Sequence, residues 1–177
     1  MDIKIRQLHE ADCTPTLLTN FNRYQEVRRC WRRTDGEWAL VDISYVEQWN
    51  DGKKQSLTAS LLAHLREGGR AVGAFDADTL VGFAWVLAEP FGSRRQYVNL
   101  DMMHTSYEYR GAGIGRRVFA AICEQARELG AEKLYISAHS AEETMAFYRK
   151  IGCVDAAEIN ESLAAAEPFD YQLEYIL

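Results

Sequence analysis

The sequence predicts one α/β domain in which strands and helices share a single core. The chain has 177 residues, enough to bury a core of useful size. Hydrophobic residues make up 47% and charged residues 26%, as in ordinary soluble globular proteins. Strand-like runs recur between stretches whose apolar residues have helical spacing. No repeat, linker or low-complexity tract divides the chain, so we expect a single domain over residues 1–177.

The charge balance limits the possible partners. The formal net charge is −6, which disfavours binding to nucleic acid or to an anionic membrane surface. The first residues, MDIKIRQLHEAD, lack the apolar centre of a signal peptide, and no apolar run approaches the about 20 residues that cross a bilayer. We therefore expect a cytoplasmic protein with no nucleic-acid or membrane partner.

The cysteines indicate buried, reduced thiols. They form no CxxC pair and no cluster with histidine at zinc spacing, so we expect neither a metal site nor a disulfide framework. The four are Cys13, Cys30, Cys123 and Cys153.

The first third of the chain gives two clear elements and one irregular region. The opening IKIRQL alternates apolar and polar residues and predicts a strand. Residues 13–67 have an irregular helical character, with a break at TDGEW (34–38). Within them, SLTASLLAHLREGG carries leucines at helical spacing and ends at a glycine pair, a typical helix stop.

The remainder alternates strands and helices. A tight turn at 76–78 joins the first two strands as a hairpin. The segment ESLAAAEPFD (161–170) is too short and too polar to assign. The predicted strands are 70–75, 79–87, 96–105, 133–138, 153–159 and 169–176, and the predicted helices are 114–129 and 141–152.

The stretch EYRGAGIGRR (108–117) places three glycines at alternate positions between a strand and a helix. Backbone N–H groups at a helix start lack intrahelical partners, and the helix dipole adds positive charge there. Glycines let an anion approach these amides, so the loop predicts a phosphate site. It is not a P-loop, because no Lys-Ser or Lys-Thr follows, and it is not GxGxxG, because Arg116 occupies the third glycine's position.

Arg-x-x-Gly-x-Gly at 110–115, together with FYRKIGC at 147–153, resembles the GNAT family of N-acetyltransferases. The resemblance covers residues 70–155 well, and residues 1–12 fit as a first strand. It implies a mixed, mostly antiparallel, twisted sheet of about six or seven strands, flanked by helices and splayed between the fourth and fifth strands. It also implies an enzyme that transfers acetyl from acetyl-CoA to an amine acceptor.

The resemblance assigns residues to coenzyme A. The loop would bind the pyrophosphate, and the strand before it would pair with the pantetheine arm. Many relatives carry an asparagine that hydrogen-bonds the pantetheine at the position of Ala141. In this chain either Ser140 or Glu143 takes over that contact, or the contact is absent. The implied cofactor-binding residues are Met103, Thr105, Arg110, Gly111, Ala112, Gly113, Ile114, Gly115, Arg116 and Ser140.

The resemblance also assigns catalytic residues. Tyr148 matches the tyrosine that faces the coenzyme's sulfur, where a protonated phenol can donate to the leaving thiolate. Asp101 and His104 are candidate bases, although strand alternation puts them on opposite faces unless a bulge intervenes. His139, at the end of the next strand, is a further open candidate.

The acceptor remains open. Within NRYQEVRRCWRRTDGEW, an aromatic and guanidinium wall would suit an acidic or planar acceptor, or the stretch would form a solvated helix face. The residues concerned are Arg28, Arg29, Arg32, Arg33, Trp31 and Trp38. Acidic residues near the C-terminus would instead favour a cationic amine. The other functions to consider are a noncatalytic acyl-CoA-binding regulatory module and a protein-interaction domain, and a homodimer is left open.

Overall fold

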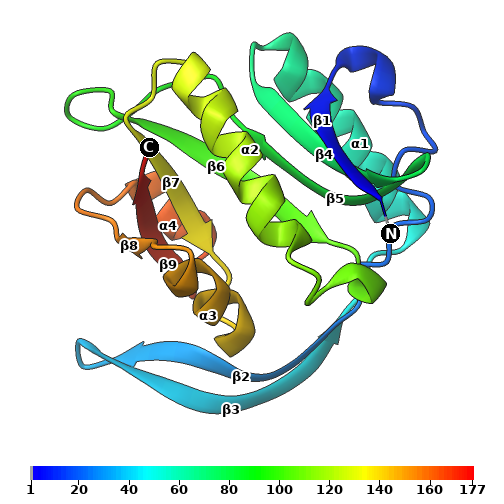
Figure 1. The fold of residues 1–177 in the computed structure, drawn as a ribbon. Coiled ribbons are helices and arrows are strands. Elements are labelled where there is room, and N and C mark those ends of the chain that lie inside the picture. Colours follow the sequence, from blue (N-terminus) through cyan, green and yellow to red (C-terminus); the bar gives the residue numbers. More distant parts are fainter. Residues whose placement is uncertain (1) are drawn as a thin grey trace.

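The structure is a computed structural model that describes residues 2–177. Within these residues, a seven-stranded sheet has the order β1-β4-β5-β6-β7-β9-β8, and β2 and β3 form a separate two-stranded hairpin (Figure 1). All neighbours in the large sheet are antiparallel except β6 and β7, which confirms the predicted mixed sheet. The strands are β1 (Ile3–Leu8), β2 (Gln25–Thr34), β3 (Glu37–Glu47), β4 (Arg70–Asp76), β5 (Thr79–Val86), β6 (Tyr97–Thr105), β7 (Lys133–Ala138), β8 (Val154–Asp155) and β9 (Tyr171–Ile176).

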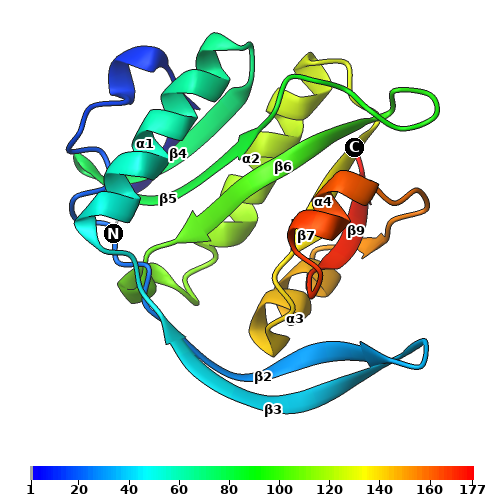
Figure 2. The ribbon, with the colours of Figure 1, turned by 180° about the vertical axis from the view of Figure 1, so that it is seen from behind.

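Helices cover both faces of the sheet. Helices α2 and α3 lie on the face toward the viewer in Figure 1, and α1 and α4 lie on the other face, seen in Figure 2. Each face has its own apolar cluster: Val118 and Ile122 of α2 belong to one, and Leu57 and Leu61 of α1 to the other. The helices are η1 (Glu10–Asp12), α1 (Asp51–Arg66), η2 (Tyr107–Tyr109), α2 (Ile114–Glu128), α3 (Glu142–Lys150) and α4 (Glu161–Ala166).

The sheet opens between β6 and β7. These strands pair only from Tyr97, opposite Lys133, to Asn99, opposite Tyr135. Beyond this point β6 stays with β5 and β7 stays with β9, so the two halves of the sheet diverge (Figure 1). Since β6 and β7 are the fourth and fifth strands across the sheet, the predicted splay is confirmed.

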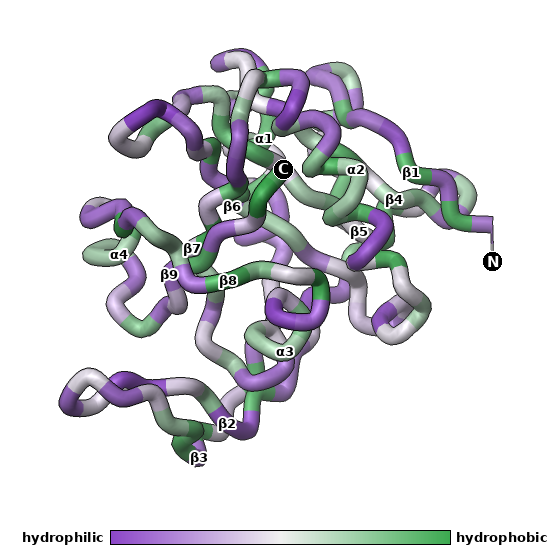
Figure 3. Tube along the Cα trace, turned by 60° about the vertical axis from the view of Figure 1, so that its left-hand side comes forward, coloured by the Kyte–Doolittle hydropathy of each residue, from purple (hydrophilic) through white to green (hydrophobic). Residues whose placement is uncertain are grey.

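The hairpin β2–β3 corrects the helical interpretation of residues 13–67 over 25–47, whereas α1 confirms the helix predicted from SLTASLLAHLREGG. Its two-residue turn is Asp35-Gly36, with φ of 51° and 85°, the backbone that a tight hairpin requires. The hairpin carries many charged residues and is coloured mostly hydrophilic in Figure 3. The charged run of β2 does not read as a half-buried strand, although in β3 the residues Val41, Ile43 and Tyr45 alternate with polar ones.

The hairpin bridges the two diverging halves of the sheet. It starts beside the β1–β5 half and runs under the opening to α3 (Figures 1 and 2). There Trp31 N–H donates to the Ser140 carbonyl at 2.8 Å, and Arg29 forms an ion pair with Glu142 at 2.6 Å. The hairpin thus closes one side of the opening.

Other elements agree with the sequence to different degrees. The predicted strand at 153–159 is only Val154–Asp155. The unassigned segment 161–170 holds α4, whose start is capped by the Asn160 side chain accepting from Leu163 N–H at 3.1 Å. Cys30, Cys123 and Cys153 are buried as expected, while Cys13 is only half-buried. Within residues 2–177, no helix has both the length and the apolar character needed to cross a bilayer.

The α2 face supplies a test of the core. Ile122 is 0% exposed, whereas Ile176, on the terminal strand, is 68% exposed. We expect Ile122→Ala to lower the free energy of unfolding by about 2–5 kcal/mol, because it leaves a cavity, and Ile176→Ala to change it by less than about 0.5 kcal/mol. Urea unfolding of both variants checks this, and equal losses would contradict the assigned packing.

Candidate active site

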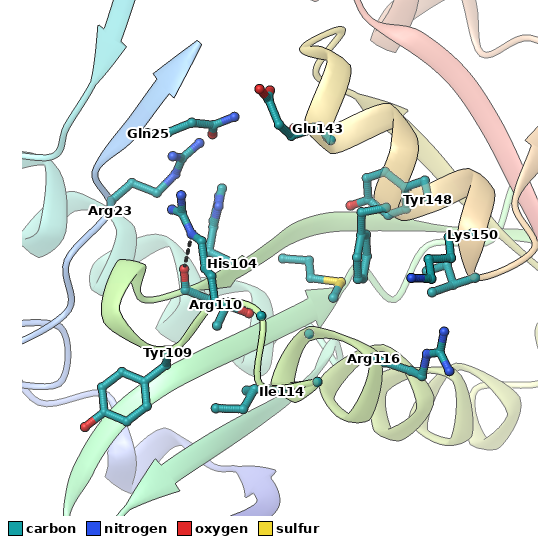
Figure 4. Close-up of a pocket in the computed structure, with 18 residues that line it drawn as sticks. Arg23, Gln25, His104, Tyr109, Arg110, Ile114, Arg116, Glu143, Tyr148 and Lys150 are labelled. Carbon is teal, nitrogen blue, oxygen red and sulfur yellow. Dashed lines mark hydrogen bonds between the residues drawn. The ribbon is translucent and has the colours of Figure 1, made fainter.

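A cavity of about 660 Å³ lies where the sheet opens, between β6, the glycine loop and α3 (Figure 4). Of the predicted site residues, Asp101, Ala112 and Ser140 do not line it. Those that do are Met103, His104, Thr105, Arg110, Gly111, Gly113, Ile114, Gly115, Arg116 and Tyr148. The structure thus brings the strand, the loop and the tyrosine helix to one place.

The three loop glycines are required for two different reasons. Gly111 and Gly113 have φ of 80° and 78°, a left-handed backbone that strains other residues, although nothing lies within 4 Å of where their Cβ atoms would be. Gly115 lies inside α2, and its Cβ would come within 3.3 Å of Phe147 Cε2. The first two glycines therefore shape the loop, and the third allows α3 to approach α2.

The start of α2 presents unpaired amides to the cavity. Its first intrahelical bond runs from Arg117 N–H to the Gly113 carbonyl at 3.2 Å, so the preceding amides of the first turn have no acceptor within the helix. Arg116 lines the cavity, but Arg117 donates instead to the Ile3 carbonyl at 2.8 Å. Arg110 Nε donates to the Thr105 carbonyl at 3.1 Å, which fixes the loop against the end of β6.

Tyr148 reaches the cavity from α3. Its side chain is 8% exposed, and its hydroxyl points toward the middle of the cavity in Figure 4. Burial raises the pKa of Tyr148 well above its usual range, with the nearby Cys153 as a smaller cause. The phenol is therefore protonated at neutral pH and available as a proton donor.

A β-bulge determines the positions of Asp101 and His104. Trp85 pairs with Met102 and Val86 pairs with Leu100, which leaves Asp101 as the extra residue. Asp101 accepts from Trp85 Nε1 at 2.8 Å, and the His104 ring packs against Phe83 at 5.8 Å. Because Trp85 and Phe83 both lie in the α1-side cluster, Asp101 and His104 share one face, and only His104 reaches the cavity.

The His104 imidazole is held neutral. Its ring also packs edge-on against Trp49, with the centroids 4.8 Å apart. Burial holds the pKa of His104 well below its ordinary value, and the nearby charges of Arg23, Arg110 and Lys53 lower it further. A neutral imidazole can accept a proton, although its basicity is weak.

The other candidates around the cavity have partners. Ser140 is 2% exposed, and its hydroxyl accepts from Arg32 Nη1 at 2.6 Å, so it is held by the hairpin. His139 Nδ1 accepts from Ala141 N–H at 3.2 Å, and Nε2 lies 2.6 Å from the Tyr45 hydroxyl. In the neutral ring, the nitrogen that accepts from Ala141 is the one with the lone pair, so that lone pair is occupied. Glu143, unlike Ser140, does line the cavity.

The arginines singled out in the hairpin have contacts away from the cavity. Arg28 pairs with Glu26, Arg29 with Glu142, and Arg32 lies 4.4 Å over the Phe169 ring. The tryptophans also pack elsewhere: Trp38 stacks on Tyr171 at 3.7 Å.

Sequence reasoning missed Arg23 and Gln25, which line the cavity from the start of β2. The Asp-Gly turn at 35–36 was the available signal, because it marks a hairpin that places these residues beside β6.

Comparison with known proteins identifies the family. The model of the acetyltransferase (GNAT) family matches residues 24–153, more than half of the chain, so the chain belongs to this family and is an acyltransferase by class. A search of curated proteins found no significant sequence match.

Solved structures share the fold at low identity. A nourseothricin acetyltransferase superposes with a TM-score of 0.69 at 18% identity, over 98% of this chain and 96% of that one. A Bacillus anthracis protein assigned as a streptothricin acetyltransferase, in complex with acetyl coenzyme A, gives 0.68 at 16% identity, over 100% and 98%. The PaiA N-acetyltransferase of Thermoplasma acidophilum, in complex with coenzyme A, gives 0.60 at 14% identity and covers 100% of both chains.

The lowered pKa of His104 predicts a pH effect on stability. An unfolded histidine binds a proton near pH 6.5, whereas folded His104 does so only at lower pH. Its contribution to the free energy of unfolding is therefore complete above about pH 6.5 and is lost as the pH falls toward the folded pKa. We expect His104→Phe to lose less stability than the wild type between pH 7 and 5 in urea unfolding. Equal losses would show that His104 does not titrate as described.

Proposed function

We propose that this protein transfers the acetyl group of acetyl-CoA directly to a primary amine of a small molecule or peptide, with Tyr148 as the general acid. The observation that carries this proposal is the convergence of the glycine loop, the open edge of β6 and the Tyr148 hydroxyl on one cavity. Two structurally similar proteins are bound to acetyl coenzyme A or coenzyme A, which supports the same cosubstrate here.

The cavity fits coenzyme A. Main-chain amides at the start of α2 can accept the pyrophosphate, and Gly111 and Gly113 leave the approach free of Cβ atoms. Arg116 and Lys150 lie toward the same end of the cavity in Figure 4 and add positive charge for the phosphates. The unpaired side of β6 at Met103 and Thr105 can hold the pantetheine arm.

In the proposed mechanism the amine attacks the thioester carbonyl and a tetrahedral intermediate forms. A main-chain N–H of the Met103–Thr105 stretch stabilises the developing oxyanion, a contribution of about 3 kcal/mol for one such donor. Tyr148 then gives its proton to the sulfur as the C–S bond breaks, so coenzyme A leaves as a thiol. His104, or water next to it, takes the proton from the attacking amine. Asp101 does not line the cavity, so the proposed mechanism gives it no proton-transfer step.

The cavity glycines allow a matched test of cosubstrate binding. Gly113 and Gly130 have nearly equal φ values of 78° and 82° and open space around both, but only Gly113 lines the cavity. Each change to alanine should cost about 1–2 kcal/mol of stability through backbone strain. Only Gly113→Ala should weaken acetyl-CoA binding, by 10-fold or more on the scale of about 1.4 kcal/mol per decade, as measured by calorimetry. Equal affinities in both variants would exclude the loop as the phosphate site.

Tyr148 supplies the catalytic test. Tyr148→Phe removes only the hydroxyl, so we expect the turnover number to fall by about 100-fold or more while the Kd for acetyl-CoA changes little. Tyr175→Phe is the control, since Tyr175 packs against Phe119 outside the cavity. An unchanged rate in Tyr148→Phe removes this residue from the mechanism.

The proposed activity itself is tested by an acceptor screen. Amines and peptides are incubated with acetyl-CoA, and both release of the coenzyme thiol and a mass gain of one acetyl group are recorded. Streptothricin-type amines belong in the panel because two structurally similar proteins carry that name or the related name nourseothricin. Acetyl-CoA binding without transfer to any amine would favour a noncatalytic acyl-CoA-binding module.

A further inference from the structure

Arg23 is a buried cation with unused hydrogen-bonding capacity. It is 7% exposed, and its Nη2 donates to Glu47 Oε2 at 2.8 Å. Its Nε and Nη1 atoms are buried, and no residue in the described range 2–177 accepts from them. Nearly all buried polar groups have a partner, so two idle donors on one charged group require an explanation.

A second cation, Arg110, lies near Arg23. Arg110 lies close enough that Arg23 contributes to lowering the pKa of Arg110, and Glu47 forms the ion pair with Arg23. His104, which is neutral, lies beside them, and the Trp49 ring packs 5.7 Å from the Arg23 guanidinium carbon. Although burial lowers the pKa of Arg23, a guanidinium stays charged at neutral pH.

Arg23 lies at the acceptor end of the cavity. In Figure 4 it sits with Gln25 and His104 beside the start of β2, far from Arg116 and Lys150 at the other end. In the proposed function the phosphates lie at the start of α2, near Arg116 and Lys150, which is away from Arg23. The idle donors of Arg23 are therefore not accounted for by the phosphates.

We propose that the acceptor amine also carries a carboxylate, and that Arg23 binds this carboxylate next to the attacking nitrogen. The planar guanidinium matches a carboxylate through paired N–H donors, and a shielded site strengthens such a bond. This inference rests on the proposed function and narrows its substrate class to amino acids and related amino carboxylates. The proposal requires a rotation of the Arg23 side chain, still held by Glu47, that brings the buried Nη1 to the ligand.

The experiment measures the preference for acceptors that carry a carboxylate, rather than activity alone. A panel of amino acids and longer amino carboxylates is assayed with acetyl-CoA, each next to its carboxamide and next to a diamine of equal length. The wild-type enzyme should show kcat/KM about 10- to 100-fold higher for the carboxylate than for the matching carboxamide. Arg23→Met should bring this ratio close to one while acetyl-CoA affinity stays within about threefold.

Two further variants separate binding from folding. Arg29→Met removes a hairpin arginine that pairs with Glu142 away from the cavity, and it should keep the full carboxylate preference. Glu47→Gln removes the internal partner of Arg23, and it should keep or increase the preference. If Arg23→Met does not fold, Arg23→Lys retains the charge without the paired donors and should lower the preference partially.

A second readout is independent of turnover. With coenzyme A saturating, an N-acetylated amino acid should raise the unfolding temperature of the wild type more than its carboxamide does, and Arg23→Met should abolish the difference. Transfer that is equal or faster to carboxamides or diamines overturns the inference but leaves the proposed function standing. A loss of acetyl-CoA affinity in Arg23→Met overturns it as well, and transfer to no amine contradicts both proposals.

Discussion

The early end of pairing between β6 and β7 is the constraint on which the rest of the structure depends. Three residue pairs hold the strands together, and after them each strand keeps only one neighbour. Backbone groups of β6 are then open toward the gap, where a sheet would normally satisfy them. The gap lies directly before the start of α2, so an extended arm and an anionic group can be bound in one continuous cavity.

The hairpin β2–β3 is the second condition for a working site. Because it is tied to the start of α3 by the Trp31 hydrogen bond and the Arg29 ion pair, it spans the opening and closes the cavity on the acceptor side. Arg23 and Gln25 enter the cavity only through this placement. In the proposed function, the loop and α2 bind the coenzyme, and the hairpin and β6 surround the acceptor.

Most of the residues that the sequence predicted for coenzyme A line one cavity, whereas part of the cavity's lining was not predicted, for physical reasons. Gly111 and Gly113 belong to a short loop motif, and Tyr148 was found through the family resemblance of FYRKIGC. The bulge at Asp101 depends on how β6 matches β5, and no local pattern announces it. Arg23 lies two residues before a hairpin whose first strand is rich in charged residues, so its burial could not be read locally, although the Asp-Gly turn of the hairpin could have been recognised.

The most direct test of the account is a crystal structure of the complex with coenzyme A. The account predicts that the diphosphate contacts main-chain amides between Gly111 and Arg116, and that the pantetheine arm runs along Met103–Thr105 with its sulfur next to the Tyr148 hydroxyl. A coenzyme bound anywhere else on the molecule, or in this cavity with the sulfur away from Tyr148, would contradict it.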